Sequence, residues 1–391
     1  MALFAQAGTL LEQADAAFRS GNLDQAASLA ARAVKSDPNA VHGYLILGVV
    51  AAERRQWEAA HRNFQRVIRL DPSNPFGYFY LGQASLYQHD WIQAVRHFTE
   101  AQKRGYPERE RLGIELAFAL NEAGRPQEAL AGLQKIPPPA GGPLAAQYHA
   151  TTAFALGRLN QPAPAIEAIR RARDLEDSKP EYWNFLTSTL IDTDQTTFAL
   201  AEAIRAQRRF PDDPDTQFLF ALASFYVTES PLSKLALRNL REAEPESPRV
   251  LLAEGLLHRK QGETEPATQA FQRAAAKGVR DAHLLLGILL KEAGDYAGAE
   301  REFREAEKEN PHNGQTLLEL GKLVLARGEL QEARSLLERA GYLMPNTSAV
   351  QYQLGLAFGR LGRKDQAEQH MNRWRELEKQ QAELLRKTPG C

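Results

Sequence analysis

Residues 314–347 read GQTLLELGKLVLARGELQEARSLLERAGYLMPNT, and this stretch decides the fold. Its apolar residues follow helical spacing on both sides of Gly328, which predicts two helices joined by a turn. Gly328 suits the end of the first helix, because glycine adopts the left-handed backbone of a helix C-terminus. Pro345 ends the second helix, because proline cannot continue the hydrogen-bond ladder. Gly321 and Ala333 are small, so that two antiparallel helices can cross closely.

The alanine at position 333 recurs along almost the entire chain at a nearly constant interval. Of the ten steps between the eleven positions, seven are 34 residues long and the others are 35, 36 and 32. The positions are Ala26, Ala60, Ala94, Ala129, Ala165, Ala199, Ser233, Ala267, Ala299, Ala333 and Ala367. A fixed period of this length is typical of a repeat architecture.

Other residue types keep the same phase in most units. The first glycine, twelve residues before the alanine, is Gly48, Gly82, Gly255, Gly287, Gly321 or Gly355. The second glycine, five residues before it, is Gly21, Gly124, Gly262, Gly294, Gly328 or Gly362. A bulky apolar residue stands four after it, at Phe64, Phe98, Leu133, Phe271, Phe303, Leu337 and Met371, and a proline often twelve after it. One such hairpin cannot bury its own apolar face, whereas stacked hairpins can.

A 34-residue helix-turn-helix with these marks resembles the tetratricopeptide repeat. The resemblance covers residues 7–373, about eleven units, and it implies an all-α fold, a right-handed α-solenoid of stacked helix-turn-helix units. Units six and seven depart from the pattern, since Thr187 and Ala221 replace the first glycine and Ser233 replaces the alanine. We expect these two units to be the most irregular.

Two segments fall outside the regular pattern. No helix runs through the prolines and glycines of residues 137–143, where we expect a long inter-repeat loop, with a hinge as the alternative. Residues 374–391 continue as a helix with no proline to stop it, carrying Trp374 and Leu377 on one side. A solenoid needs an end helix with a polar outer face, so we interpret this segment as a capping helix and tail.

Charge and cysteine content exclude several classes of function. The chain has 48 Lys and Arg against 49 Asp and Glu, so it lacks the basic excess that nucleic-acid binding requires. Its one cysteine, Cys391, cannot form an internal disulfide or a cysteine metal site. No run of 18 apolar residues predicts a transmembrane helix. The start of the chain fits a frayed helix in a cytoplasmic protein, with export as the alternative if the true start lies upstream.

No catalytic or cofactor motif appears in the sequence. Nine histidines are scattered without an HExxH pair, and the phosphate-loop, dinucleotide and nucleophile-elbow glycine motifs are missing. The carboxylates lie in mixed charge runs, which are usually solvated helix faces. We therefore predict a protein that is not an enzyme and has no cofactor or metal.

The resemblance also implies where a partner binds, because in this family the first helix of each unit lines the concave face. Its groove positions here give an aromatic stretch in units three to seven and a basic stretch in units eight to ten. The aromatic stretch, with its interspersed amides, is Phe76, Phe79, Gln83, Tyr87, Phe118, Asn121, Phe154, Asn184, Phe218, Phe225 and Tyr226. The basic stretch is Arg259, Lys260, Lys291 and Lys322, partly offset by Glu292.

The family's carboxylate clamp for chaperone C-termini requires Lys at the fifth and Asn at the ninth position of one unit. Units two and three instead have Leu45 and Phe79 at the fifth position and Val49 and Gln83 at the ninth, so a chaperone co-factor role loses support. Our hypothesis is a non-catalytic scaffold or adaptor that binds a protein or peptide partner in its concave groove. The alternative is a structural solenoid that assembles with itself.

Overall fold

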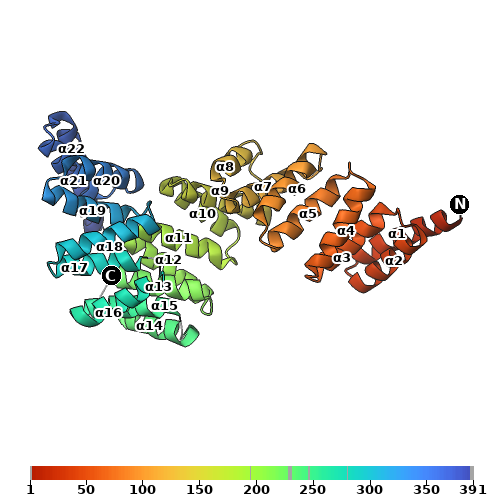
Figure 1. The fold of residues 1–391 in the computed structure, drawn as a ribbon, viewed down its shortest axis with the longest axis horizontal. Helices are drawn as coiled ribbons and strands as arrows, with labels where there is room; N and C mark the ends of the chain where they lie inside the picture. Colours follow the sequence, from red (N-terminus) through yellow and green to blue (C-terminus); the bar gives the residue numbers. More distant parts are fainter. Residues whose placement is uncertain (1, 194, 228–230, 245–246, 280, 388–391) are drawn as a thin grey trace. The chain divides into compact units, whose positions relative to one another are not determined.

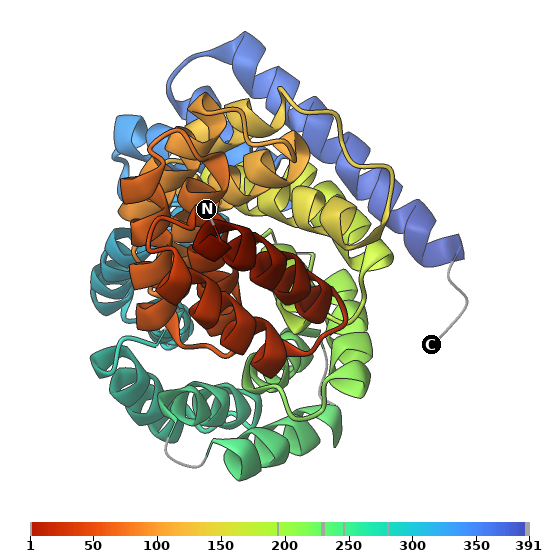
Figure 2. The same ribbon diagram turned by 90° about the vertical axis from the view of Figure 1, so that its right-hand side faces the viewer.

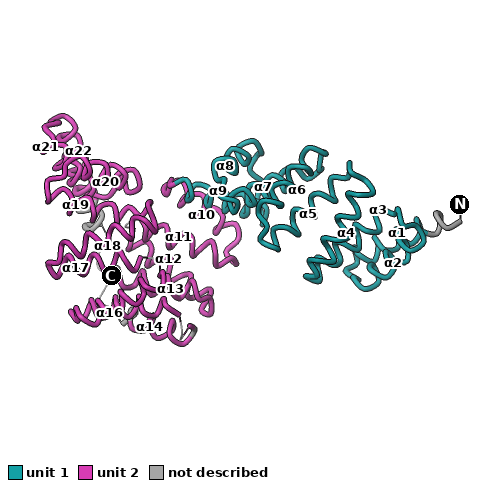
Figure 3. The backbone as a smooth tube through the Cα atoms, in the orientation of Figure 1, with its two compact units in different colours: residues 1–159 teal, residues 160–391 magenta. Residues whose placement is uncertain are grey.

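The computed structural model consists of helical hairpins in two compact units (Figures 1 and 3). Unit 1 is residues 1–159 and unit 2 is residues 160–391. The structure describes the backbone of residues 2–193, 195–227, 231–244, 247–279 and 281–387, and within them the side chains at 2–6, 226, 227, 231–233, 243 and 381–387 are not described. No strand occurs in these ranges, which confirms the all-α solenoid.

The helices follow one another with short turns between them. Unit 1 contains α1 (Ala2–Arg19), α2 (Leu23–Ser36), α3 (Val41–Glu53), α4 (Trp57–Leu70), α5 (Pro75–Tyr87), α6 (Trp91–Lys103), α7 (Arg109–Glu122), α8 (Pro126–Leu133) and α9 (Gly142–Arg158). Unit 2 contains α10 (Pro162–Leu175), α11 (Pro180–Asp192), α12 (Thr196–Arg209), α13 (Pro214–Val227), α14 (Pro231–Ala243), α15 (Pro248–Lys260), α16 (Thr264–Ala276), α17 (Ala282–Glu292), α18 (Tyr296–Glu309), α19 (Gly314–Arg327), α20 (Leu330–Leu343), α21 (Ser348–Arg360) and α22 (Lys364–Lys387).

Local sequence signals set where these helices begin. Asn74 caps α5 by accepting hydrogen bonds from the backbone N–H groups of Phe76 and Gly77, both at 3.1 Å. Pro75 occupies the first turn, where a missing N–H costs nothing. Asp90 caps α6 in the same way, through the N–H of Gln93.

The turn inside each hairpin whose turn residues the structure describes has a left-handed residue. All six glycines of the second-glycine position have a positive φ, and Gly328, at +90°, is one of them. Where the sequence has no glycine at this position, Arg55, His89 and Asn160 adopt the same conformation, each with a φ of 57°. A side chain at such a φ is strained, so the hairpin geometry overrides residue preference there.

The first glycine makes room for the bulky residue sixteen positions later in the same hairpin. A Cβ atom at Gly82 would lie 2.5 Å from Cδ1 and Cε1 of Phe98, closer than carbon atoms approach. Gly255 stands in the same relation to Phe271, again at 2.5 Å. The phenyl ring therefore occupies the volume that a side chain on the first helix would otherwise fill.

In units that lack the first glycine, the residue sixteen positions later is smaller than phenylalanine. The glycine–phenylalanine pairs are Gly48/Phe64, Gly82/Phe98, Gly255/Phe271 and Gly287/Phe303, whereas the alanine pairs are Ala117/Leu133, Ala153/Ile169 and Ala221/Leu237. Unit six combines Thr187 with Ala203. All the members of these pairs are buried. Units six and seven, expected to be irregular, form helices of 13 or 14 residues like their neighbours, because a smaller partner compensates for the missing glycine.

The proline-rich segment is a loop between α8 and α9 inside unit 1. Ile136 at its start packs beside Gly113, whose added Cβ would lie 3.1 Å from Ile136 Cδ1. The Tyr148 hydroxyl donates to the backbone oxygen of Leu133 across the loop at 3.4 Å. The division into compact units falls later, after Leu159, so that α9 belongs to unit 1 and α10 to unit 2.

The last helix of unit 2 is longer than its predecessors, at 24 residues, and Figure 2 shows it as one uninterrupted helix. Its first part packs on α21, where the rings of Trp374 and Tyr352 lie 5.2 Å apart. Leu377 is buried further along. The segment interpreted as a capping helix and tail thus continues the final repeat's second helix as far as Lys387, and residues 388–391 lie outside the described part.

Candidate functional site

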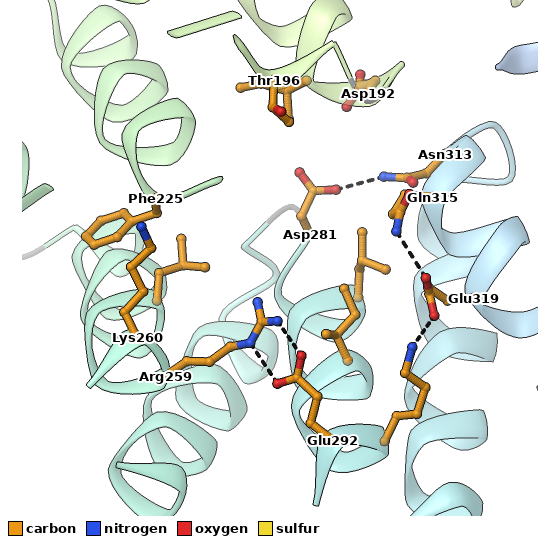
Figure 4. Close-up of a pocket in the computed structure, with 15 residues that line it drawn as sticks. Asp192, Thr196, Phe225, Arg259, Lys260, Asp281, Glu292, Asn313, Gln315 and Glu319 are labelled. Carbon is orange, nitrogen blue, oxygen red and sulfur yellow. Dashed lines mark hydrogen bonds and ion pairs between the residues drawn. The ribbon is translucent and has the colours of Figure 1, made fainter. Parts of the chain in front are cut away.

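A cavity of about 580 Å³ opens on the first helices of consecutive hairpins in unit 2 (Figure 4). The helices α15, α17 and α19 supply most of its lining, with contributions from α11, α12 and α13. The lining residues are Ile191, Asp192, Thr196, Phe225, Leu256, Arg259, Lys260, Asp281, Leu284, Ile288, Lys291, Glu292, Asn313, Gln315 and Glu319. Four of the residues predicted to bind a partner lie together in this cavity: Phe225, Arg259, Lys260 and Lys291.

An ion pair links the first two of these helices. Arg259 on α15 contacts Glu292 on α17 through two hydrogen bonds, Nε to Oε2 at 3.0 Å and a terminal nitrogen to Oε1 at 2.5 Å. Two parallel bonds between a guanidinium and a carboxylate fix the direction of both groups. In Figure 4 the two side chains face each other from neighbouring helices.

A buried carboxylate links α17 to α19. Glu319 is 4% exposed and contacts the ammonium groups of both Lys291 and Lys322, the latter at 2.7 Å. Gln315 donates to the same carboxylate at 3.2 Å. Burial alone would raise the pKa of Glu319, but the charge of Lys322 and the hydrogen bonds from both lysines outweigh it, so the pKa is lowered.

These contacts form a charge ladder, which we define as Arg259, Glu292, Lys291, Glu319 and Lys322. Positive and negative groups alternate along it from α15 to α19. The expectation of a basic surface is therefore wrong for three of its four residues. Arg259, Lys291 and Lys322 are each paired with a carboxylate. One of these carboxylates, Glu319, lies outside the expected groove positions.

An amide and a carboxylate hold the end of the cavity nearest to the start of α19. Asn313 caps α19 by accepting from the N–H of Thr316 at 2.9 Å, and it donates to Asp281 at 3.1 Å. Asp281 has a left-handed φ of 66° at the start of α17. Leu284 and Ile288 add apolar groups to the lining beside them.

Several residues of the expected aromatic stretch lie in the core. Phe79 is 0% exposed and stacks on Tyr106, with ring centroids 4.2 Å apart. Asn121 is also 0% exposed and donates to the backbone oxygen of Thr151. Phe225 is 4% exposed, although it reaches the cavity wall. These three residues pack the solenoid itself, which corrects their expected role as open groove contacts.

Other predicted residues are accessible in unit 1. Tyr87 is 62% exposed and stacks on Trp57 at 3.9 Å between ring centroids. Phe118 is half-buried and meets Trp91 edge-on at 6.5 Å. Phe154 is half-buried as well.

The remaining predicted residues have partners within their own unit. Phe76 meets Tyr106 edge-on at 5.3 Å, and Gln83 is hydrogen-bonded to Glu115. Asn184 donates to Asp213 at 2.9 Å, and the Arg249 guanidinium lies over the ring of Phe218. Tyr226 is on α13, but its side chain is outside the part that the structure describes. The aromatic stretch is thus divided between two units and is not one continuous surface.

The sequence carried one overlooked signal for the cavity. Glu319 interrupts the apolar run from Leu317 to Leu320, and a charge on a buried helix face needs a partner. Asp281 and Asn313 gave no such signal, because acids and amides are common in turns.

Two general features complete the description. Among the described residues, no group of three or more His, Cys, Asp and Glu side chains has the arrangement of a metal site. Within the same ranges, none of the helices combines the length and apolar character needed to cross a lipid bilayer.

Comparisons with known proteins agree with this architecture. Family models described as tetratricopeptide repeat match residues 11–75 and 290–357. The crystal structure of the APC/C hetero-tetramer Cut9–Hcn1 is similar over 95% of this chain and 87% of that chain, with a TM-score of 0.51 and 12% identity. That likeness concerns the fold. No curated protein sequence matches the chain.

The fold and the concave cavity together define an α-solenoid of helical hairpins. The chain contains tetratricopeptide repeats, which family models match at residues 11–75 and 290–357. Proteins with such repeats are generally non-catalytic, and the chain is in general terms a protein-interaction scaffold.

Proposed function

We propose that the cavity of unit 2 binds a peptide segment of a partner protein and that the chain acts as a scaffold or adaptor through this contact. The single observation that supports the proposal is the cavity of about 580 Å³ built from the first helices of successive hairpins. Pockets of this size with an apolar floor and a few fixed polar groups are typical ligand sites.

The lining suggests the chemistry of the segment. Ile288 is half-buried and lies in the lining with the buried Leu256 and Leu284, so it offers apolar contact area and favours a segment with at least one apolar side chain. Asp281 and Gln315, both half-buried in the lining, are polar groups suited to a peptide backbone. Because the charge ladder alternates in sign, a partner with charges in the complementary order is selected over one with the reverse order.

A charge swap tests the proposal without removing an ion pair. Arg259→Glu combined with Glu292→Arg keeps two opposite charges within reach but reverses their order along the cavity. The matched control is Arg125→Glu with Glu128→Arg, an exposed pair in unit 1 whose wild-type contact is 2.6 Å. Each variant is used to capture partners from the native cell, with mass spectrometry as readout and circular dichroism as a check of folding.

We expect the cavity swap to lose partners that the wild type and the control swap both retain. An additional Ile288→Ala variant probes the apolar floor. If both cavity variants capture the same partners in the same amounts as the wild type, the cavity is not the binding site.

A further inference from the structure

A row of rings lies over the turns of unit 1, apart from the cavity of unit 2. We name Trp57, Tyr87, His89, Trp91 and Phe118 the aromatic strip. Stacked or edge-on contacts join Trp57 to Tyr87, His89 to Trp91, and Trp91 to Phe118. Tyr87 is the last residue of α5 and His89 lies in the turn that follows it, so the contacts follow one another from α4 to α7.

The strip is partly open to solvent although its rings are apolar. Tyr87 (62%) and His89 are exposed, whereas Trp57, Trp91 and Phe118 are half-buried. Ile92, next to Trp91, is 76% exposed. An exposed apolar patch of several neighbouring residues usually marks an interaction surface. The rings hold one another in place, so they lose little conformational freedom when a ligand covers them.

The strip also presents hydrogen-bond donors. In the described part of the chain, neither Trp57 nor Trp91 has a hydrogen-bond partner for its indole N–H, and neither nitrogen is among the buried polar atoms that lack one. Trp183 differs, since its indole donates to the backbone oxygen of Asp177 at 3.0 Å. Two accessible donors between flat rings suit a ligand that offers carbonyl oxygens and compact apolar rings.

The same unit carries a segment with this chemistry. Residues 136–139, Ile-Pro-Pro-Pro, form the proline segment between α8 and α9, and Pro137 and Pro138 are exposed. Each of its first three residues precedes a proline, which restricts the segment to an extended, polyproline II backbone. Within the described residues, no hydrogen bond reaches the carbonyl oxygens of this segment. Its three prolines have no N–H to satisfy.

We infer that a second copy of this chain is the occupant of the aromatic strip, through its proline segment. Aromatic-lined surfaces bind polyproline II segments, because proline rings pack on aromatic faces and the carbonyl groups accept from indole donors. Both the strip and the segment belong to unit 1. Two copies can therefore exchange segments in a two-fold pair, which closes on itself and leaves no strip uncovered.

The first experiment measures the molar mass of the full chain by size-exclusion chromatography with light scattering over a range of concentrations. Tyr87→Ala shortens the strip, and Pro137→Ala with Pro138→Ala loosens the segment at two exposed positions. Tyr342→Ala is the matched control, because Tyr342 is a tyrosine of equal exposure, 63%, in unit 2. We expect a dimer whose dissociation constant rises about tenfold in the first two variants and is unchanged in the control.

The second experiment locates the contact. A synthetic peptide of residues 134–141 is added to the full chain while the indole N–H resonances are followed by NMR. We expect those of Trp57 and Trp91 to shift and that of Trp183 to stay in place. A chain that is monomeric at every concentration overturns the inference. So does a dimer of equal stability in all variants, or a peptide that moves neither Trp57 nor Trp91.

Discussion

Gly82→Ala tests the pairing of the two helices in one hairpin. The new Cβ would lie 2.5 Å from two ring atoms of Phe98, whose side chain is fully buried. Overpacking of this kind costs about 1–3 kcal/mol. Alanine is favoured over glycine within a helix by about 1 kcal/mol, which offsets part of the cost. We expect a net local destabilisation of up to about 2 kcal/mol.

A second substitution in the same hairpin should reverse the effect. Gly82→Ala with Phe98→Leu creates the combination that unit four already uses at Ala117 and Leu133. The leucine side chain reduces the clash: at Gly321 of unit ten, an added Cβ would lie 2.9 Å from Leu337, against 2.5 Å from Phe98 at Gly82. A double-mutant cycle should therefore give a favourable coupling of at least about 1 kcal/mol, as expected for residues in direct contact.

Native-state hydrogen exchange with mass spectrometry is the assay, because a repeat protein opens locally and a global midpoint would average over its units. Peptides from α5 and α6 report the affected hairpin. Gly132→Ala is the control, since a Cβ at this helical glycine would meet nothing within 4 Å. The pairing explanation is wrong if Gly82→Ala leaves the hydrogen-exchange protection of α5 unchanged relative to the wild type, as Gly132→Ala should leave that of α8. It is also wrong if the free-energy changes of the two single variants add up to that of the double variant.

Further perturbations give opposite or pH-dependent outcomes. Glu319→Gln should lower local stability at pH 7 by about 1–2 kcal/mol, because it leaves two lysines facing an uncharged group. Glu115→Gln should raise local stability, since burial raises the pKa of Glu115. Native-state hydrogen exchange of α19 and of α7 measures the two changes. The stability lent by the Glu319 carboxylate should be lost as pH falls through its lowered pKa. Burial lowers the pKa of His97 to about 4, so on acidification this histidine takes up its proton at a higher pH in the unfolded chain than in the folded one. Stability should therefore fall from pH 6.5 towards pH 4, and an NMR titration of the His97 ring tests the lowered pKa. At the hairpin turn, Gly328→Ala should destabilise by about 1 kcal/mol, because its φ is +90°. Arg55→Gly should relieve strain at the equivalent position, and hydrogen exchange of the flanking helices compares the two variants.

The sequence was sufficient for the repeat architecture because the informative residues act locally. Gly328 and the other second glycines mark hairpin turns wherever they occur, and the small residues recur at one interval. The pairing across each hairpin was less visible. Thr187 and Ala221 alone indicate irregular hairpins, because they replace the first glycine. The smaller residue sixteen positions after each of them provides the space that the glycine provides in other units.

The candidate site was harder to predict because it depends on contacts between repeats. Phe79 occupies a groove position, but Tyr106 at the end of the same repeat stacks on it and removes it from the surface. Arg259 and Glu292 are 33 residues apart, and their charges reveal nothing about their contact until two hairpins are stacked. The repeat pattern therefore predicts which helices line the groove, but not which of their side chains remain exposed to a partner once neighbouring helices have packed.

The division into units also lacked a sequence signal. It falls after Leu159, where Asn160 takes the place of the usual glycine, whereas the prolines at 137–143 suggested a joint. Because Ile136 and Tyr148 anchor the two ends of that loop within unit 1, its composition alone is a poor guide to mobility. The hinge stays a prediction, and mild proteolysis tests it: no cleavage near 137–143 would refute it.

The pairing of first glycine and bulky residue restricts the order in which repeats of this kind can diverge. To pass from Gly82/Phe98 to the type of Ala117/Leu133, a lineage must change two positions. If alanine comes first, the intermediate carries the full clash with the phenyl ring; if leucine comes first, the later alanine meets a smaller one. Unit ten has that second intermediate, Gly321 with Leu337, where an added Cβ would lie 2.9 Å from two leucine atoms, against 2.5 Å from Phe98 at Gly82. The route through the Gly/Leu pair costs less at each step, so we expect duplicated repeats to replace the residue of the second helix before that of the first.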